Sequence, residues 1–238
     1  MPQTNEFPKE LDRLLSHMEA LAQDRSRPWV TLSYAQSLDG SIASHRSAPL
    51  ALSGSATLKI THSLRANHSV ILVGIGTLIA DDPQLNTRLV NGSDPQPVVL
   101  DRQLRFPLDA RLLRGQKSPW IFTNLHAQPE REAALTKAGA RVFRPETEMY
   151  SIGEILSFLG QQGMPSVMVE GGAGVITSFL QAQLVDLVVL TIASRLIGGV
   201  RGIENLLAYG GPRLEKFGVK NFGEDLLVWG CPRWNKEV

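Results

Sequence analysis

A short apolar run that meets one carboxylate and then a glycine-rich turn constrains the fold of this chain most. The stretch reads VMVEGGAGVITSFL, in which residues 167–169 are apolar and Glu170 stands directly before two glycines. After the turn, Ile176, Phe179 and Leu180 recur at helical spacing. The glycines therefore connect a buried strand to a helix, which is the usual connection in an α/β protein.

A glycine turn of this kind can bind an anion. Glycines let a ligand approach the backbone, and the first amides of a helix are unpaired and lie at the positive end of its dipole. The same turn could equally serve only to pack a strand close to a helix. Neither GGAGVIT nor the earlier GIGTLI completes the G-x-G-x-x-G dinucleotide motif. A standard Rossmann site is therefore not expected.

Strand and helix patterns alternate along most of the chain. Apolar spacing predicts an opening helix at residues 11–22 and further helices at 56–67 and 129–139. Short apolar or β-branched runs predict strands at residues 27–38, 69–74, 98–100, 120–122, 140–143, 186–193, 219–222 and 226–229. This order predicts an α/β fold, a three-layer α/β/α sandwich around a mostly parallel mixed sheet whose closing strands could run antiparallel.

The composition favours a globular protein that acts on a small molecule. With 238 residues, 43% of them apolar, the chain can bury a substantial core. Lys plus Arg (24) nearly balance Asp plus Glu (23) without a basic run, so nucleic acid and membrane surfaces are not expected partners. No apolar stretch approaches the roughly 20 residues of a membrane span, and no signal pattern opens the sequence. We therefore expect a cytoplasmic protein.

Metal and disulfide chemistry are not expected. The single cysteine, Cys231, can form no internal disulfide and has no partner at zinc-binding spacing. His62 and His68 are six residues apart and the other three histidines are isolated. Each histidine is expected to lie on the surface or to serve packing.

Five motifs, in order and at compatible spacing, together point to one family. They are SLDGSIA at residues 37–43, LRANHSVILVGIGTLIADDPQLNTR at 64–88, VVLDRQLRFPLDARLL at 98–113, VMVEGGAGVITSFLQAQLVDLV at 167–188 and ASRLIGG at 193–199. Over about residues 28–230 the chain resembles the riboflavin-biosynthesis diaminopyrimidine reductases, which include the reductase half of the bifunctional riboflavin deaminase/reductase. Residues 1–27 are expected to be an amphipathic helical extension, and residues 28–238 the reductase domain.

The resemblance implies a dihydrofolate-reductase-like fold, a homodimer and NADPH as hydride donor. It implies reduction of the ribosyl group of a ribosylaminopyrimidine 5′-phosphate to a ribityl group. One cysteine excludes the zinc site of the deaminase half. Two alternatives stay open, a reductase of another small heterocycle and a nucleotide-binding regulator without chemistry. The retained Glu170 and arginines disfavour the regulator.

The resemblance also assigns site residues. Those implied to bind the cofactor are Ala35, Thr77, Asp81, Gly172, Ala173, Gly174, Val175, Ile176, Thr177 and Ser178. Those implied to bind the substrate are Arg65, Leu85, Arg88 and Glu170. Arg65 and Arg88 are expected to anchor its 5′-phosphate, although either alone could be a solvated residue. Arg102 is placed where a 2′-phosphate could be met, although a solvated surface arginine is an equal alternative. We expect GIGTLIADDP to be a short polar turn that brings a hydroxyl and a carboxylate to one ligand edge.

Two carboxylates are candidates for catalysis. Asp39 is the candidate proton donor at the nicotinamide end, and its alternative is a structural turn residue. Glu170 is expected to accept hydrogen bonds from the pyrimidine or ribose, because an unpaired buried carboxylate is costly, and its alternative is a cap on the next helix. Relatives often carry a serine near Pro49, so Ser47 or Ser53 could take its place here, and the exact substrate is open.

Overall fold

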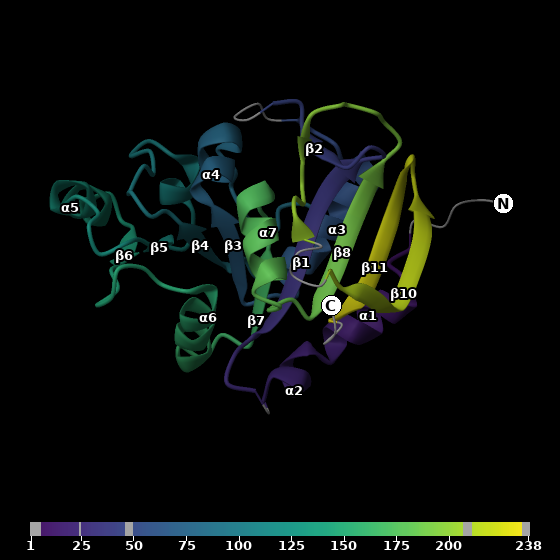
Figure 1. The fold of residues 1–238 in the computed structure, drawn as a ribbon, viewed down its shortest axis with the longest axis horizontal. Helices are drawn as coiled ribbons and strands as arrows, with labels where there is room; N and C mark the ends of the chain where they lie inside the picture. The colour runs from purple at the N-terminus through teal and green to yellow at the C-terminus, as the bar shows by residue number, and fades with distance from the viewer. Residues whose placement is uncertain (1–5, 24, 46–49, 207–210, 235–238) are drawn as a thin grey trace.

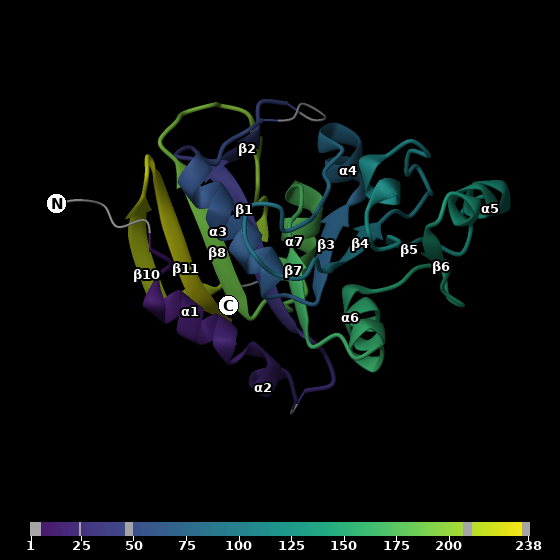
Figure 2. The same ribbon diagram turned by 180° about the vertical axis from the view of Figure 1, so that it is seen from behind.

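A nine-stranded sheet runs through the protein, and helices cover both of its faces (Figure 1, Figure 2). The computed structural model describes residues 6–23, 25–45, 50–206 and 211–234. The strand order is β10-β11-β8-β1-β7-β3-β4-β5-β6. The strands from β8 to β6 are parallel, whereas β11 pairs antiparallel with β8 and with β10. The predicted mixed α/β sheet is therefore confirmed.

Each strand of the large sheet overlaps a predicted one, although β10 begins at Arg213 rather than at residue 219 and β11 continues to Arg233 rather than ending at residue 229. Their bounds are β1 Trp29–Ser37, β3 Val70–Gly74, β4 Gln96–Leu100, β5 Trp120–Phe122, β6 Arg141–Phe143, β7 Ser166–Val169, β8 Leu187–Ala193, β10 Arg213–Phe222 and β11 Asp225–Arg233. Two short strands that the sequence did not predict, β2 Ser41–Ala43 and β9 Val200–Arg201, form a separate two-stranded sheet. This small sheet lies beyond one end of β1 and β8 (Figure 1).

The helices differ from the predictions in three places. Their bounds are α1 Lys9–Ser16, α2 Met18–Gln23, α3 Ser55–Ala66, α4 Ile75–Asp81, α5 Pro129–Lys137, α6 Ile152–Gln161 and α7 Ala173–Gln181, with a 3₁₀ turn at Arg111–Arg114. The opening helix is split at His17. The expected polar turn after β3 is helix α4, which ends at the left-handed Asp82 directly before a proline. Helix α6 was not predicted, although Ser151 and Glu154 form a capping box at its start.

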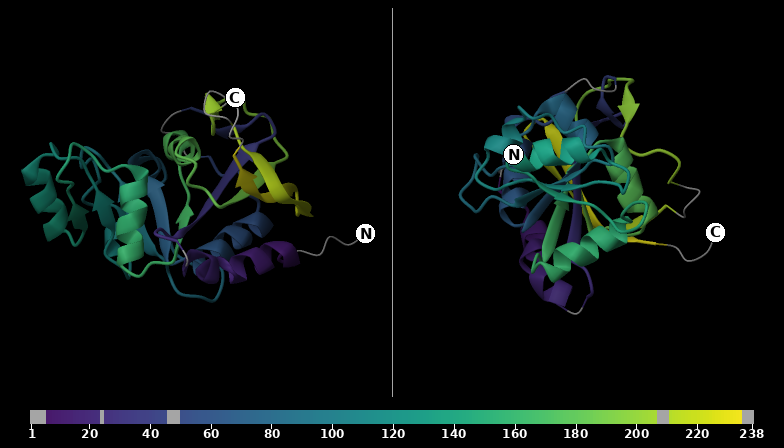
Figure 3. Two further views of the ribbon diagram at one scale, coloured as in Figure 1. Left: turned by 60° about the horizontal axis from the view of Figure 1, so that its bottom comes forward. Right: turned by 90° about the vertical axis from the view of Figure 1, so that its left-hand side faces the viewer.

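Alternation along the buried strands sends side chains to both faces of the sheet. In β3, Val70 and Leu72 pack in the layer that contains α6 and α7, whereas Ile71 and Val73 pack in the layer that contains α4 and α5. Helices α1, α2 and α3 extend that second layer. Figure 3 shows α1 and α7 on opposite sides of the sheet. The three-layer prediction is confirmed.

The opening helices belong to the core of the described structure. Leu11, Leu15 and Met18 are at most 4% exposed and pack with Trp29 and Trp229. The segment after α2 is fixed by Asp186, whose carboxylate accepts hydrogen bonds from Arg25 and Arg27. The division of the chain at residue 27 stays a prediction, but this packing indicates that both parts fold together.

Leu11→Ala tests this packing. Because Leu11 is fully buried, we expect its truncation to lower the free energy of unfolding by about 2–5 kcal/mol. Leu21→Ala in α2 is the control, because Leu21 is 43% exposed and its loss should cost less than about 0.5 kcal/mol. Denaturant unfolding of both variants provides the measurement. Equal stability of the two variants would show that α1 does not contribute to the core.

The sequence predicted no metal site, no internal disulfide and no membrane span. Among the described residues, no group of three or more His, Cys, Asp or Glu side chains could hold a metal ion. His62 and His68 are buried, and burial lowers the pKa of each ring to about 4. Burial also raises the pKa of the half-buried Cys231 thiol. The structure describes no helix with the length and apolar character needed to cross a membrane.

Candidate functional site

A cleft of about 1370 Å³ opens at the carboxyl ends of the parallel strands. Its floor includes Ala35 of β1, Gly74 at the end of β3, Leu100 at the end of β4 and Glu170 directly after β7. Open α/β sheets bind their ligands at this edge, because the strand-to-helix loops meet there. The volume exceeds the roughly 300–1,000 Å³ of a pocket for one small ligand. The cleft therefore has room for a cofactor and a substrate together.

Most of the predicted site residues lie around this cleft. The lining includes Ala35, Arg65, Thr77, Asp81, Arg102, Glu170, Gly172, Ala173, Gly174, Val175, Thr177 and Ser178. Asp39, Leu85, Arg88 and Ile176 are not part of the lining. The motifs thus meet at one place in the fold, with these four exceptions.

The glycine turn is shaped first by packing. A Cβ atom on Gly74 would lie 2.7 Å from Val175, and one on Gly171 would lie 2.9 Å from it. Helix α7 can therefore approach the end of β3 only because both positions lack a side chain. For these two glycines the packing interpretation is correct.

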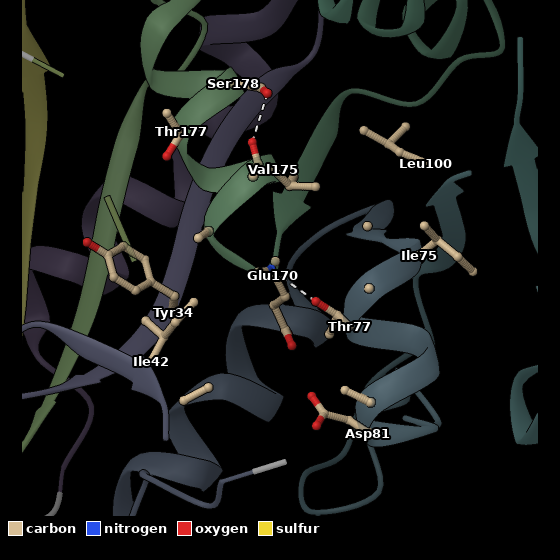
Figure 4. Close-up of a pocket in the computed structure, with 18 of the residues that line it drawn as sticks. Tyr34, Ile42, Ile75, Thr77, Asp81, Leu100, Glu170, Val175, Thr177 and Ser178 are labelled. Carbon is tan, nitrogen blue, oxygen red and sulfur yellow. Dashed lines mark hydrogen bonds between the residues drawn. The ribbon is translucent and has the colours of Figure 1, made fainter. Parts of the chain in front are cut away.

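Thr77 links α4 to the glycine turn. The Gly172 amide donates a hydrogen bond of 2.9 Å to the Thr77 hydroxyl, so this amide is already used within the protein (Figure 4). The first two amides of α7, those of Ala173 and Gly174, stand at positions that an α-helix leaves without an internal acceptor. These two amides, at the positive end of the helix dipole, can bind a phosphate.

The later residues of α7 offer fewer groups to a cofactor than the family motif implied. Ile176 is fully buried in the core, so its predicted contact with the cofactor is wrong for the side chain. Its amide is also used, because it donates to the Gly172 carbonyl. The Ser178 hydroxyl donates back to the Gly174 carbonyl at 2.8 Å.

Glu170 is paired with Arg65. The guanidinium donates from Nε to Oε1 and from Nη2 to Oε2, both at 2.7 Å, and from Nη1 to the Asn86 carbonyl at 3.1 Å. The two side chains are 10% and 18% exposed. Burial alone would lower the pKa of Arg65, but the Glu170 carboxylate outweighs it and raises that pKa. The alternative that Glu170 caps the next helix is wrong, because its oxygens accept from Arg65 and α7 has no side-chain cap.

The Arg88 guanidinium lies close to the Arg65–Glu170 pair. Arg88 is exposed and donates to the Asn86 side chain at 3.0 Å. Burial, followed by the positive charges of Arg65 and Arg111, lowers the pKa of the Arg88 guanidinium. Leu85 is 3% exposed and lines a separate cavity of about 420 Å³, so its side chain does not reach the cleft as predicted.

The surroundings of Asp39 disfavour the proton-donor role that the sequence suggested. Its carboxylate accepts hydrogen bonds from the Ser37 and Ser41 hydroxyls and from the Ile197 and Gly198 amides, at 2.6–2.9 Å. These bonds hold the pKa of Asp39 well below its usual range. A carboxylate stabilised in this way does not carry a proton to donate.

Asp81 and Glu204 are the two cleft carboxylates for which the described structure gives no side-chain partner, and of the two Asp81 lies near Glu170. Asp81 ends helix α4, and its side chain lies on the same side of Glu170 as Thr77 (Figure 4). Tyr34 and Ile42 lie on the other side of Glu170. Burial raises the pKa of Asp81, and no ion pair within the described ranges includes it.

Several cleft residues were missed by the sequence analysis. They include Tyr34, Ile42, Arg105, Phe122 and Tyr150. Burial raises the pKa of Tyr34 to about 12. Ile42 and Arg105 stand within motifs that were quoted, but Phe122 and Tyr150 come from other segments and meet only in the fold, as an edge-to-face pair at 5.3 Å.

The segment near Pro49 is only partly described. Pro49 and Ser47 lie outside the described residues. Leu50 and Ser53 line the cleft, so the Ser53 hydroxyl is available at the place where the sequence departs from its relatives.

Comparisons with known proteins identify relatives of the chain. The family model of the RibD C-terminal domain matches residues 28–228. The chain is 32% identical over 214 residues to a riboflavin biosynthesis protein RibD of Aquifex aeolicus, covering 86% of this chain and 58% of that protein. It is 35% identical over 212 residues to a 2,5-diamino-6-ribosylamino-4(3H)-pyrimidinone 5′-phosphate reductase of Methanothermobacter thermautotrophicus, covering 85% of this chain and 97% of that protein.

Solved structures agree with the fold. Acinetobacter baumannii RibD superposes with a TM-score of 0.76 at 27% identity, over 89% of this chain and 60% of that one. An Enterococcus faecalis dihydrofolate reductase superposes with a TM-score of 0.51 at 12% identity, over 85% of this chain and 96% of that one. The predicted dihydrofolate-reductase-like fold is thereby confirmed. The chain spans about 60% of the length of the RibD proteins and nearly all of the shorter reductase.

Proposed function

Because this chain belongs to the RibD C-terminal domain family, we propose that it is an NADPH-dependent reductase that converts the ribosyl group of a ribosylaminopyrimidine 5′-phosphate to a ribityl group. One observation carries this proposal. Most of the residues that the family motifs assign to cofactor and to substrate, from four separate parts of the chain, line a single cleft. A relative of nearly the same length bears the name of such a reductase.

The cofactor fits the side of the cleft formed by α4 and α7. The amides of Ala173 and Gly174 would hold the pyrophosphate at the start of α7. Arg102 and Arg105 line the same cleft beyond β4 and carry positive charge for a 2′-phosphate. Ala35 would border the nicotinamide, and Thr77 and Asp81 would contact the cofactor, as the family motifs imply. NADPH, when bound, supplies the hydride.

The substrate fits beside the Arg65–Glu170 pair. Each Glu170 oxygen uses one lone pair for Arg65 and keeps another, which can accept from an amino group or a ribose hydroxyl. Arg65 thereby fixes the direction of the Glu170 carboxylate. Arg88, close to the charges of Arg65 and Arg111, would be neutralised by the substrate 5′-phosphate. The anchor for that phosphate is therefore assigned to Arg88, with Arg65 in support.

The reaction also needs a proton. When the bond between C1 and the ring oxygen of the sugar breaks, that oxygen must be protonated. Asp39 is held as a carboxylate by its hydrogen bonds, and both oxygens of Glu170 accept hydrogen bonds from Arg65. Asp81 lies in the cleft, burial raises its pKa, and a ligand that displaces water would raise it further. We assign the donor role to Asp81.

Turnover of the candidate substrates tests the proposed function. NADPH oxidation, followed by its absorbance, is measured with the deaminated and with the non-deaminated ribosylaminopyrimidine 5′-phosphate. Oxidation with either one, and a ribityl product, supports the proposal. NADPH binding without oxidation would favour the regulator, and turnover of a different heterocycle alone would favour the other reductase.

Cofactor preference should depend on Arg102. Charge-assisted bonds to a phosphate contribute roughly 1.5–3 kcal/mol, so Arg102→Ala should raise KM for NADPH about tenfold or more and leave KM for NADH unchanged. Arg114→Ala, outside the cleft, is the matched control. Steady-state kinetics with both cofactors provide the measurement. If Arg102→Ala keeps the wild-type preference for NADPH, another residue binds the 2′-phosphate. If the wild type is equally efficient with NADH and NADPH, the assignment of NADPH as the cofactor is wrong.

The predicted homodimer and cytoplasmic location are part of the proposal. Strand β10 ends the sheet in the described structure, and its Phe217 and Val219 are 59% and 50% exposed. These two apolar side chains stand among charged ones on an open sheet edge, which is a surface that a second copy could pair with. Light scattering after gel filtration measures the mass in solution, and a monomer at all concentrations would contradict the dimer.

A further inference from the structure

The small sheet of β2 and β9 forms one wall of the cleft. We call residues 40–45 and 196–202 the flap; it contains both strands, which pair Ser41 with Arg201 and Ala43 with Val200. Ile42, Ala43 and Val200 line the cleft. Ile42 lies beside Tyr34, across Glu170 from Asp81 (Figure 4). The position of the flap therefore sets the width of the cleft opposite α4.

The two halves of the flap are far apart in the sequence, and Asp39 joins them. Oδ1 accepts from the Ser37 hydroxyl at 2.6 Å and the Ile197 amide at 2.9 Å. Oδ2 accepts from the Ser41 hydroxyl at 2.7 Å and the Gly198 amide at 2.8 Å. Each oxygen thus bonds one hydroxyl on its own side of the flap and one amide on the opposite side.

Neighbouring contacts keep the two halves close. The Gly199 amide donates to the Ser41 hydroxyl at 2.9 Å. A Cβ atom on Gly199 would lie only 2.1 Å from the Ala43 carbonyl oxygen, so the two backbones touch. Gly202 packs against Tyr34 and Ile42, where a Cβ would lie 3.3 Å and 2.9 Å from their side chains. Displacement of one half would therefore change the wall of the cleft.

We propose that Asp39 is a positioning residue, whose carboxylate latches the flap against the cleft so that the substrate is held for reduction. This inference rests on the proposed function only for the identity of the substrate. The carboxylate acts through the flap and touches no ligand, because it lies outside the cleft lining. An asparagine cannot replace it. Its NH₂ group would face either the Ile197 or the Gly198 amide, donor against donor.

The latch is tested with Asp39→Asn and Ser41→Ala. Ser41→Ala leaves the carboxylate in place but removes its hydroxyl donor and the acceptor of the Gly199 amide. Asp109→Asn, an exposed aspartate outside the cleft, is the matched control. Hydrogen–deuterium exchange of the ligand-free protein is measured for a peptide covering residues 194–202, with the α7 peptide as internal reference. Steady-state kinetics and the pH profile of kcat are then measured with the pyrimidine substrate.

Both latch variants should show at least about tenfold faster exchange at residues 194–202, because hydrogen bonds to a charged group are lost there. The α7 peptide and the control should not change. KM for the pyrimidine should rise about tenfold, by more than kcat falls, and the pH profile should keep its shape, because Asp39 does not titrate near neutral pH.

Two results would overturn the latch. One is unchanged exchange in Asp39→Asn. The other is a loss of kcat in Asp39→Asn alone, with one limb of the pH profile missing, because that result would make Asp39 the proton donor. The exchange measurement needs no substrate, so it decides the latch even if wild type reduces neither pyrimidine, an outcome that would refute only the proposed function.

Discussion

Asp81→Asn should lower kcat by about 10²–10⁴-fold, the usual contribution of a positioned proton donor. The asparagine keeps the size of the side chain but cannot release a proton. Because the raised pKa of Asp81 keeps the acid protonated to higher pH than an ordinary aspartate, wild-type kcat should fall as the pH rises through that pKa. In Asp81→Asn this alkaline decline should be absent.

The assignment depends on what the other acidic groups already bind. Both oxygens of the Glu170 carboxylate accept hydrogen bonds from Arg65, so Glu170 already serves as an acceptor. Tyr34, with a pKa of about 12, is too weak an acid for this role. His45 and Glu204 are exposed at the flap side of the cleft. Asp81 is the remaining acid beside Thr77 and Glu170, where the predicted cofactor and substrate residues meet (Figure 4).

The controls separate chemistry from binding. NADPH affinity, measured by fluorescence, should change little in Asp81→Asn, and His45→Gln should keep most of the wild-type kcat. If Asp81→Asn retains kcat and its pH dependence while His45→Gln loses both, the proton comes from His45. A loss of NADPH affinity with normal kcat at saturation would restrict Asp81 to the cofactor contact predicted from the sequence.

Arg65→Met should lower the free energy of unfolding by about 3–5 kcal/mol, because it leaves the Glu170 carboxylate, only 18% exposed, without its cation. The aliphatic stem is kept, so the loss reports the missing charge rather than a cavity. Glu170→Gln should lower the free energy of unfolding by less, because its remaining side-chain oxygen can still accept a hydrogen bond from Arg65. It should keep the fold and NADPH binding but lose most of the turnover, since the substrate meets a weaker and misdirected acceptor.

An exposed ion pair in the same protein provides the control. Arg233 and Glu215 are 70% and 51% exposed, so Glu215→Gln should cost less than about 1 kcal/mol. Denaturant unfolding measures all three variants. The double variant Arg65→Met, Glu170→Gln should recover part of the stability and none of the turnover. If Arg65→Met costs no more than Glu215→Gln, the buried pair does not stabilise the fold, and if Glu170→Gln turns over normally, Glu170 is structural.

Much of the site could be predicted because it follows directly from strand ends. Thr77, Glu170 and Ala173 stand within a few residues of a buried strand, and parallel strands bring such positions to one edge of the sheet. Local sequence patterns did not predict helix α4. The helix contains Gly76, which disfavours a helix in isolation, but Ile75 and Leu78 are buried against the sheet and stabilise it there.

The sequence by itself determined the strand-to-helix alternation, the mixed sheet and the edge where a cleft would form, because these depend on the local periodicity of apolar residues and on the positions of glycines. Only the tertiary structure decided which polar side chains pair. Arg65 meets Glu170, and Asp39 meets Ile197 and Gly198, across more than 100 residues of chain. A carboxylate looks the same in the sequence whether it will bind a ligand, hold an arginine or join two loops. Its role depends on which donors surround it, and here those donors come from distant segments that only the folded sheet brings together.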